Sequence, residues 1–247
     1  RIGRPNKYGI PPAYFDADIE PLIEEYSNLF GSLEKAPSFA QASKTPFKDV
    51  VDIGTMIGRV KGLDPETARA AGRIALGIFF AETNGKQNIG NTRSKKYKGS
   101  LQTGVRENRN GQRKWQSVKK KAAKLDPAFA KRDAQEQARA KNIDERYNHW
   151  VAVRNGLMNA HADLFAQLPT ITRMLPDEMD QMKFFQLIQL IPTPTRKALR
   201  SGDIESYRIT SPRIMGYLRN NSIFTFGKKD RAKKSATYRE ILDAMWL

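Results

Sequence analysis

The stretch from Asp64 to Thr83 constrains the fold most strongly, because it carries the signals of a complete helix. Asp64, Pro65 and Glu66 predict a helix start, with an N-cap aspartate, a proline at the first helical position and a carboxylate in the first turn. The apolar stripe that follows consists of Ala71, Ile74, Ala75, Ile78 and Phe79. The next position on this stripe is Glu82, so the sequence predicts a core-facing carboxylate at the C-terminal end of a helix. Burial and the helix dipole are both expected to raise the pKa of Glu82.

Helical periodicity also dominates the rest of the chain, and the predicted fold class is mainly α. Further helices are expected over residues 16–35, 49–61, 112–141 with a break at Asp126-Pro127, 142–168, 178–191, 195–201, 211–220 and 236–246. The segment 84–112 is rich in Gly and Asn and is expected to form a loop or a small β-hairpin region. Residues 1–60 are predicted to form an N-terminal arm and helical extension, and residues 61–247 the main domain.

The composition indicates a globular protein without metal or cofactor. Of the 247 residues, 39% are hydrophobic, which is enough for a substantial core. No apolar run approaches the roughly 20 residues that span a bilayer. Because cysteine is absent, neither a disulfide nor a thiolate metal site can form. The two histidines, His149 and His161, are interpreted as structural or surface residues, so we expect no metal site.

The chain is strongly basic, with 43 Lys and Arg against 26 Asp and Glu and a net charge of +17. Such a field attracts polyanions, among them nucleic acid, anionic lipid surfaces and acidic cell-wall polymers. The charge is concentrated between Arg93 and Lys141, where 16 basic residues stand against 4 acidic ones. The partner is therefore expected near the segment that follows Glu82.

Two short motifs flank the predicted loop, Glu-Thr-Asn at 82–84 and Gly-Ser-Leu-Gln-Thr-Gly at 99–104. Together they resemble the Glu-Ser-x-x-Asn and Gly-x-x-Gln motifs of the lysozyme-like superfamily, which includes lytic transglycosylases and goose-type lysozymes. In those families a Glu ends a buried helix, and a Gly-Leu-Met-Gln-type strand then crosses the cleft. Here Gly99 follows Glu82 by 17 residues and Gln102 follows it by 20, which is similar to the family spacing.

The resemblance implies a lysozyme-like helical domain that cleaves the β-1,4 glycan strand of peptidoglycan, with Glu82 as the general acid. The candidates for binding the saccharide are Thr83, Gly99, Ser100, Gln102, Tyr97 and Tyr147. Thr83 would match the serine that follows the family's acid. Tyr147-Asn148 is the nearest match to the family's Ala-Tyr-Asn-Ala-Gly-like motif, but no Gly follows it. A core-facing tyrosine on a helix is the alternative interpretation of Tyr147.

A second carboxylate would separate two reactions. A hydrolase commonly uses a second Asp or Glu, whereas a lytic transglycosylase can work with one acid and the substrate's own groups. Glu107 is the only acidic residue between Glu82 and Asp126, and it lies 25 residues after Glu82. An Asp at a similar distance helps to position water in goose-type lysozymes, which makes Glu107 the candidate partner. A solvated Glu between Arg106 and Arg109 is the alternative, and the single-acid reaction stays open.

Two other functions fit the sequence. The same fold and acid could act on chitin or its deacetylated form, although a basic protein would repel a polycationic glucosamine chain. The basic segment 93–141 could instead belong to a protein without enzymatic activity that binds nucleic acid or another polyanion. Aromatic residues for base stacking are sparse there, with Tyr97 and Trp115. The resemblance favours peptidoglycan glycan strands as the partner. It also implies a monomeric bacterial protein that is periplasmic or secreted, with a signal peptide that is not present in this chain.

Overall fold

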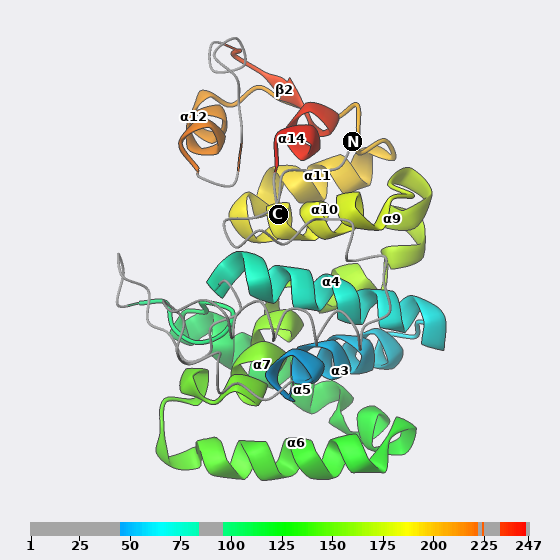
Figure 1. Cartoon of the computed structure of the whole chain (residues 1–247), viewed down its shortest axis with the longest axis vertical. Helices are drawn as coiled ribbons and strands as arrows, with labels where there is room; N and C mark the ends of the chain where they lie inside the picture. The colour runs from blue at the N-terminus through cyan, green and yellow to red at the C-terminus, as the bar shows by residue number, and fades with distance from the viewer. Residues whose placement is uncertain (1–44, 84–95, 222–223, 225–232, 246–247) are drawn as a thin grey trace, which may run out of the picture. The chain divides into compact units, whose positions relative to one another are not determined.

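A computed structural model describes residues 45–83, 96–221, 224 and 233–245 (Figure 1). Helices make up most of these residues, so the predicted mainly α class is confirmed. Contacts divide the described chain after Leu168 into two compact units. The first unit contains α3 (Thr45–Val60), α4 (Pro65–Thr83), α5 (Val105–Leu125), α6 (Pro127–Arg139), η2 (Ala140–Asn142), η3 (Glu145–Tyr147), α7 (His149–Ala160) and α8 (Ala162–Phe165). The second contains α9 (Leu168–Met174), α10 (Glu178–Leu190), α11 (Pro192–Ser201), β1 (Arg208–Ile209), α12 (Pro212–Asn220), β2 (Ala236–Thr237) and α14 (Tyr238–Ala244).

α4 forms where the sequence predicts it, and its start is capped as expected. The Asp64 carboxylate accepts hydrogen bonds from the backbone N–H groups of Glu66 and Thr67, both at 3.0 Å. The predicted apolar stripe of this helix is buried. α4 lies along α3 (Figure 1) and packs against it closely, since a Cβ atom on Gly54 would come within 2.7 Å of the Cβ of Ala75. α3 is therefore part of the first unit.

α7 is the buried centre of the first unit. Every residue from His149 to Met158 is buried, and α3 and α5 both pack against this helix. α5 approaches so closely that a Cβ atom on Gly111 would overlap the backbone carbonyl of Asn155. A helix that is buried on all sides belongs to the core rather than to a surface layer. The N-terminus of α7 consequently provides a fixed position for the loops that reach it.

A carboxylate and a guanidinium are buried together where α5, α6 and α7 meet. Asp133 is 2% exposed and Arg154 is 0% exposed, and Arg154 NH1 lies 2.5 Å from Asp133 Oδ1. The indole N–H groups of Trp115 and Trp150 donate to the two oxygens of the same carboxylate, at 2.8 and 2.9 Å. Arg154 also donates to the amide side chains of Gln112, Gln137 and Asn155. These hydrogen bonds compensate the cost of burying the two charges.

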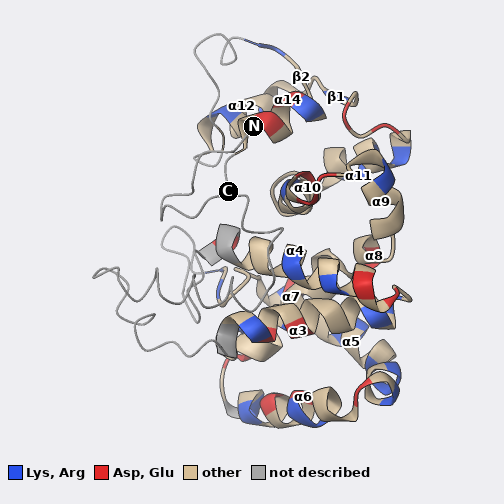
Figure 2. Cartoon of the chain, turned by 45° about the vertical axis from the view of Figure 1, so that its right-hand side comes forward, with Lys and Arg blue, Asp and Glu red and all other residues tan. Residues whose placement is uncertain are grey.

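The loop predicted over residues 84–112 is shorter than expected, because α5 begins at Val105. Glu107 stabilises this start, since its carboxylate accepts a hydrogen bond of 2.7 Å from the backbone N–H of Gly104. This arrangement is one half of a capping box. Lys and Arg positions are numerous along α5, and α6 carries both basic and acidic positions (Figure 2).

The single helix predicted over residues 142–168 is divided into η3, α7 and α8. The break before α7 has a local cause, because the Asn148 side chain accepts a hydrogen bond from the backbone N–H of Val151. Asn at this position favours a helix start over a helix interior. The predicted boundary between residues 1–60 and 61–247 stays a prediction. Residues 1–44, which include the helix expected at 16–35, lie outside the described residues.

The second unit joins helices to one small antiparallel sheet, in which Arg208 pairs with Thr237. Two buried hydrogen bonds tie α14 to the helices before it. Tyr238 donates its hydroxyl hydrogen to Thr195 Oγ1 at 2.8 Å, and Lys183 Nζ donates to the backbone carbonyl of Leu242 at 3.1 Å.

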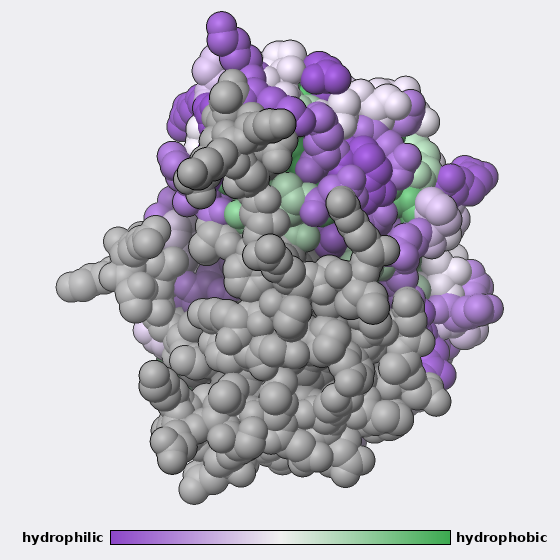
Figure 3. Space-filling view, turned by 45° about the horizontal axis from the view of Figure 1, so that its top comes forward, coloured by the Kyte–Doolittle hydropathy of each residue, from purple (hydrophilic) through white to green (hydrophobic). Residues whose placement is uncertain are grey.

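The described surface seen in Figure 3 is mainly hydrophilic, with apolar side chains in small areas.

Asp49 on α3 should make the stability of the first unit depend on pH. Its carboxylate is 6% exposed and pairs with Arg132, whose NH2 lies 2.7 Å from Asp49 Oδ1. Burial raises the pKa of Asp49 from 3.8 to about 6, although Arg132 acts in the opposite direction. The folded state therefore binds this proton more tightly than the unfolded state. The stability that it contributes is present at low pH and is lost as the pH rises from about 4 to about 6.

The measurement is the free energy of unfolding of the wild type and of Asp49→Asn at several pH values. The interval between the two pKa values corresponds to roughly 3 kcal/mol. The wild type should therefore lose up to about 3 kcal/mol relative to Asp49→Asn between pH 4 and pH 7. A difference that stays constant over this range, or that grows in favour of the wild type, would contradict the expected titration.

Candidate functional site

Glu82 lies in the last turn of α4, one turn beyond the buried Phe79. The residue is half-buried, which agrees with its expected place on the apolar side of the helix. No basic residue lies in this last turn, and the carboxylate lies at the end of α4 to which the helix dipole gives a partial negative charge. The side chain of Thr83 and the motif residue Asn84 lie outside the described residues.

The second motif forms a tight turn. Lys98 and Thr103 pair through two backbone hydrogen bonds of 3.2 and 3.0 Å, which make an antiparallel bridge. Gln102 closes the turn, because its backbone N–H and its side-chain Nε2 both donate to the carbonyl of Gly99, at 3.0 and 2.9 Å. Gly99 has a φ of 78° and Gln102 a φ of 49°, so both residues adopt the left-handed conformation. The predicted small hairpin region after the Glu82 helix is therefore present in compact form.

Arg146 in η3 binds this turn to the segment that precedes α7. Its NH1 group donates to the backbone carbonyls of Lys96 at 2.8 Å and Thr103 at 3.3 Å, so it joins the two sides of the turn. Asp144 fixes the guanidinium by accepting from its Nε and NH2 groups at 2.8 and 2.6 Å. These hydrogen bonds hold the pKa of Asp144 below its usual value. A Cβ atom on Gly99 would overlap the carbonyl of Arg146, so the turn can lie this close only with glycine.

His149, the first residue of α7, contacts Ser100 of the second motif and Phe79 of α4. Its Nδ1 atom and the Oγ atom of Ser100 form a buried hydrogen bond of 2.7 Å. Its ring also meets the ring of Phe79 edge-on, with the centroids 5.3 Å apart. Phe79 precedes Glu82 by one helical turn. The end of α4 and the turn at Gly99 are consequently fixed on the same buried residue.

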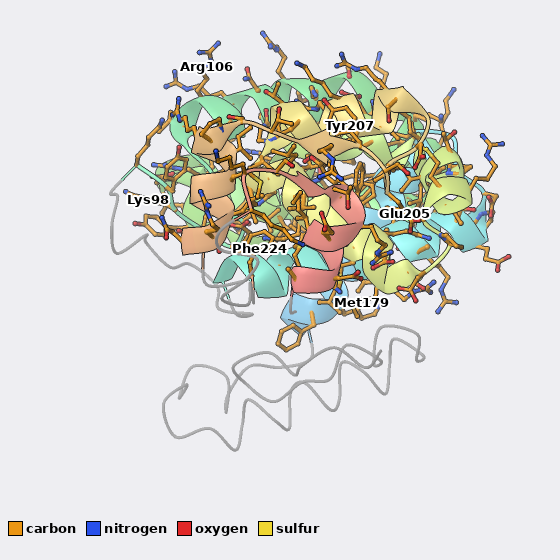
Figure 4. The ribbon with its side chains drawn as sticks, turned by 90° about the horizontal axis from the view of Figure 1, so that it is seen from above. Lys98, Arg106, Met179, Glu205, Tyr207 and Phe224 are labelled. Atoms are coloured by element: carbon orange, nitrogen blue, oxygen red, sulfur yellow. The ribbon has the colours of Figure 1, made fainter. Side chains whose placement is uncertain are left out.

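Two predicted saccharide-binding tyrosines lie beside lysines. Lys98 Nζ is 5.1 Å from the ring centroid of Tyr147 and 3.6 Å from Asp144 Oδ2. Tyr97 is half-buried, and Lys96 Nζ lies 5.2 Å from its ring centroid. Figure 4 labels Lys98 on the segment that leads into the turn. Tyr97 and Tyr147 are therefore each paired with a lysine through a cation–π contact.

Glu107 has a structural role that is separate from Glu82. Its Oε2 atom accepts the hydrogen bond from Gly104 and thereby caps α5. A carboxylate that satisfies a helix N-terminus is held in one orientation. Its catalytic role beside Glu82 stays a prediction. No acidic residue lies between Glu82 and Glu107 in the sequence.

Arg146 and His149 are not among the site residues that the sequence predicts. Arg146 reaches carbonyls 50 and 43 residues earlier in the chain, and His149 meets Ser100 across 49 residues. Local patterns do not report contacts over such distances. The one available signal was the Asp-x-Arg spacing of Asp144 and Arg146 next to a helix start, which favours a local ion pair without indicating its partners.

Two further features, metal clusters and membrane-spanning helices, are absent from the described residues. There, no three His, Asp or Glu side chains gather as a metal site would require. None of the helices in the described ranges combines the length and the apolar character that a membrane span needs. No family model matches the chain, and no curated protein or solved structure matched it in comparison.

Proposed function

We propose that this protein cleaves the β-1,4 glycan strand of peptidoglycan, with Glu82 as the general acid. The observation that carries the proposal is the double contact of His149, with Ser100 on one side and Phe79 on the other. It supports a common site for Glu82 and the Gly99–Gln102 turn, which 16 intervening residues separate in the sequence. The carboxyl group of Glu82 is half-buried at the end of a helix, and general acid catalysis of glycoside cleavage requires a carboxyl group positioned beside the substrate.

The reaction favoured by these residues uses a single acid. Glu107 is engaged at the start of α5, so the proposal assigns both proton transfers to Glu82. In the single-acid reaction, Glu82 donates its proton to the glycosidic oxygen as the bond to the anomeric carbon breaks. Its carboxylate then accepts the proton of the C6 hydroxyl of the same muramyl residue, whose oxygen bonds to that carbon. The product is a 1,6-anhydro ring, and no water is consumed.

Peptidoglycan is a better substrate for this surface than chitin or its deacetylated form. Muramyl residues and their peptides carry carboxylates, which a chain with a net charge of +17 would attract. Chitin has no such charge, and a deacetylated chain carries ammonium groups that this net charge would repel. The proposed substrate implies action in the periplasm or outside the cell of a bacterium.

The test is the digestion of purified sacculi by the wild-type protein, followed by mass analysis of the soluble products. We expect muropeptides with 1,6-anhydro ends, each lighter by one water than the corresponding reducing end. Chitin and its deacetylated form, incubated in parallel, should release much less soluble sugar. Failure to release any muropeptide would refute the proposed function, and reducing ends would replace the single-acid reaction with hydrolysis.

A further inference from the structure

A second feature of the first unit, independent of Glu82, is the distribution of charge on α5. This helix carries eight Lys and Arg residues and a single acidic residue, Glu107, at its start. Two of the lysines are used inside the unit. Lys114 Nζ lies 3.0 Å from Asp163 Oδ2, and Lys121 Nζ donates to the carbonyl of Val60 at 2.7 Å. Lys114 is therefore paired with a carboxylate, and Lys121 is tied to the backbone of the unit.

Five other cations form what we call the α5 basic face: Arg106, Arg109, Arg113, Lys120 and Lys124. All five are exposed, and Arg106 projects away from the ribbon in Figure 4. At about 100° per residue they fall within a sector of about 60° around the helix, and they span about 27 Å along it. Among the described residues, none of the five forms an ion pair with a carboxylate.

The orientation of this face is set by the core. The residues that α5 buries are Asn108, Gly111, Trp115 and Ala122. Gly111 lies against the backbone of α7, and Trp115 donates its indole hydrogen to Asp133. The α5 basic face is consequently presented by a helix that is fixed on its other side, so a ligand would meet preformed cations.

The α5 basic face does not stabilise the helix that bears it. Like charges three or four positions apart repel on a helix surface, as do Arg106 with Arg109 and Lys120 with Lys124. Among the described residues, no ion pair with a carboxylate offsets this repulsion. A polyanion lying along the helix would compensate it, and its binding would release the counterions that it carries.

The side chains of α5 point to one class of polyanion. Along the helix, Gln116 lies between the cations and can donate to and accept from phosphates and base edges, whereas Asn110 accepts from Arg113 and Ser117 donates to the carbonyl of Lys114. Trp115, the one aromatic residue of α5, is 1% exposed, so this face offers no platform for stacking single-stranded bases. A helix with its side chains is about 10–12 Å wide, and the major groove of duplex DNA is about 12 Å wide.

We propose that the α5 basic face binds duplex DNA, with its five cations on the phosphates. The length of about 27 Å corresponds to about eight base pairs at 3.4 Å each. Because phosphates supply the contacts, binding should depend weakly on base sequence. Five phosphate contacts predict that log Kobs falls with log salt concentration with a slope of about −4.5.

The experiment measures the fluorescence anisotropy of a labelled 20-base-pair duplex titrated with the full chain at several salt concentrations. One variant replaces all five cations of the α5 basic face by Gln. Its matched control replaces five exposed cations of the second unit by Gln, so both variants lose the same charge. The control residues are Arg173, Arg196, Lys197, Arg200 and Arg213. Circular dichroism checks that both variants retain their helices.

We expect the α5 variant to bind the duplex at least about 100-fold more weakly than the wild type, and the affinity of the control variant to change less than about 3-fold. The salt slope should approach zero only in the α5 variant. Equal weakening of both variants would overturn the proposal in favour of the net charge of the chain. Tighter binding to a single strand of the same length would also overturn it. So would equally effective competition by a glycerol-phosphate polymer, because the site would then select any polyphosphate.

Discussion

Replacing Glu82 by glutamine is expected to reduce muropeptide release from sacculi by roughly 10²–10⁴-fold, the range that a general acid contributes. Glutamine keeps the size and hydrogen-bonding capacity of the side chain but cannot transfer a proton. Since Glu82 is half-buried at the end of α4, the substitution should leave the helix and its contact with α7 in place. The measurement is the rate at which soluble muropeptides appear, compared at equal concentrations of folded protein.

Two variants serve as controls for Glu82. Glu66→Gln makes the same chemical change at the exposed N-terminal end of α4, and its activity should match that of the wild type. Glu107→Gln weakens the cap of α5, so it should lower the free energy of unfolding by about 1 kcal/mol and leave most of the activity. If folded Glu107→Gln is as inactive as Glu82→Gln, the reaction uses two carboxylates. If Glu82→Gln keeps full activity, the assignment of the acid is wrong.

Replacing Asp133 by asparagine is expected to lower the free energy of unfolding by about 3–5 kcal/mol, because it leaves the charge of Arg154 buried without its partner. Arg154 is 0% exposed, and Asp133 also accepts the indole hydrogens of Trp115 and Trp150. The asparagine amide cannot accept three donors through two oxygens as the carboxylate does. Urea unfolding followed by tryptophan fluorescence should report the loss directly.

An exposed ion pair provides the comparison for Asp133. Asp163 is 64% exposed and pairs with Lys61 at 2.7 Å and with Lys114 at 3.0 Å. Because water screens this cluster, Asp163→Asn should cost no more than about 1 kcal/mol. A loss for Asp133→Asn that is no larger than the loss for Asp163→Asn would show that the buried pair does not hold α5, α6 and α7 together.

Several elements could be predicted from the sequence because their signals are local. The Asp64-Pro65-Glu66 start fixes the beginning of α4, and the apolar stripe after it is buried as expected. The break between α5 and α6 was also predictable, since Asp126 accepts a hydrogen bond from the backbone N–H of Phe129 and Pro127 follows it directly. In each case, neighbouring residues supply the hydrogen bonds that decide the structure.

The beginning of α5 was mispredicted for a physical reason. Residues 105–112 contain Asn and Gly together with charged residues, which favours a loop when only local propensity is considered. The structure shows a helix there, because Gly111 permits the close approach to α7 and Glu107 caps the first turn. The benefit of that glycine exists only once α7 is beside it.

The sequence by itself determined that α4 ends on a core-facing carboxylate and that positive charge accumulates after it. Only the tertiary structure decided what holds the Gly99 turn and which cations of α5 form ion pairs. Arg146 and His149 hold the Gly99 turn through contacts across 43 to 50 residues, and Glu107 is used in a helix cap. Such partners are chosen by burial and packing, which act between segments far apart in the chain. Periodicity and capping act within a few residues, so they could locate Glu82 but could not identify its neighbours.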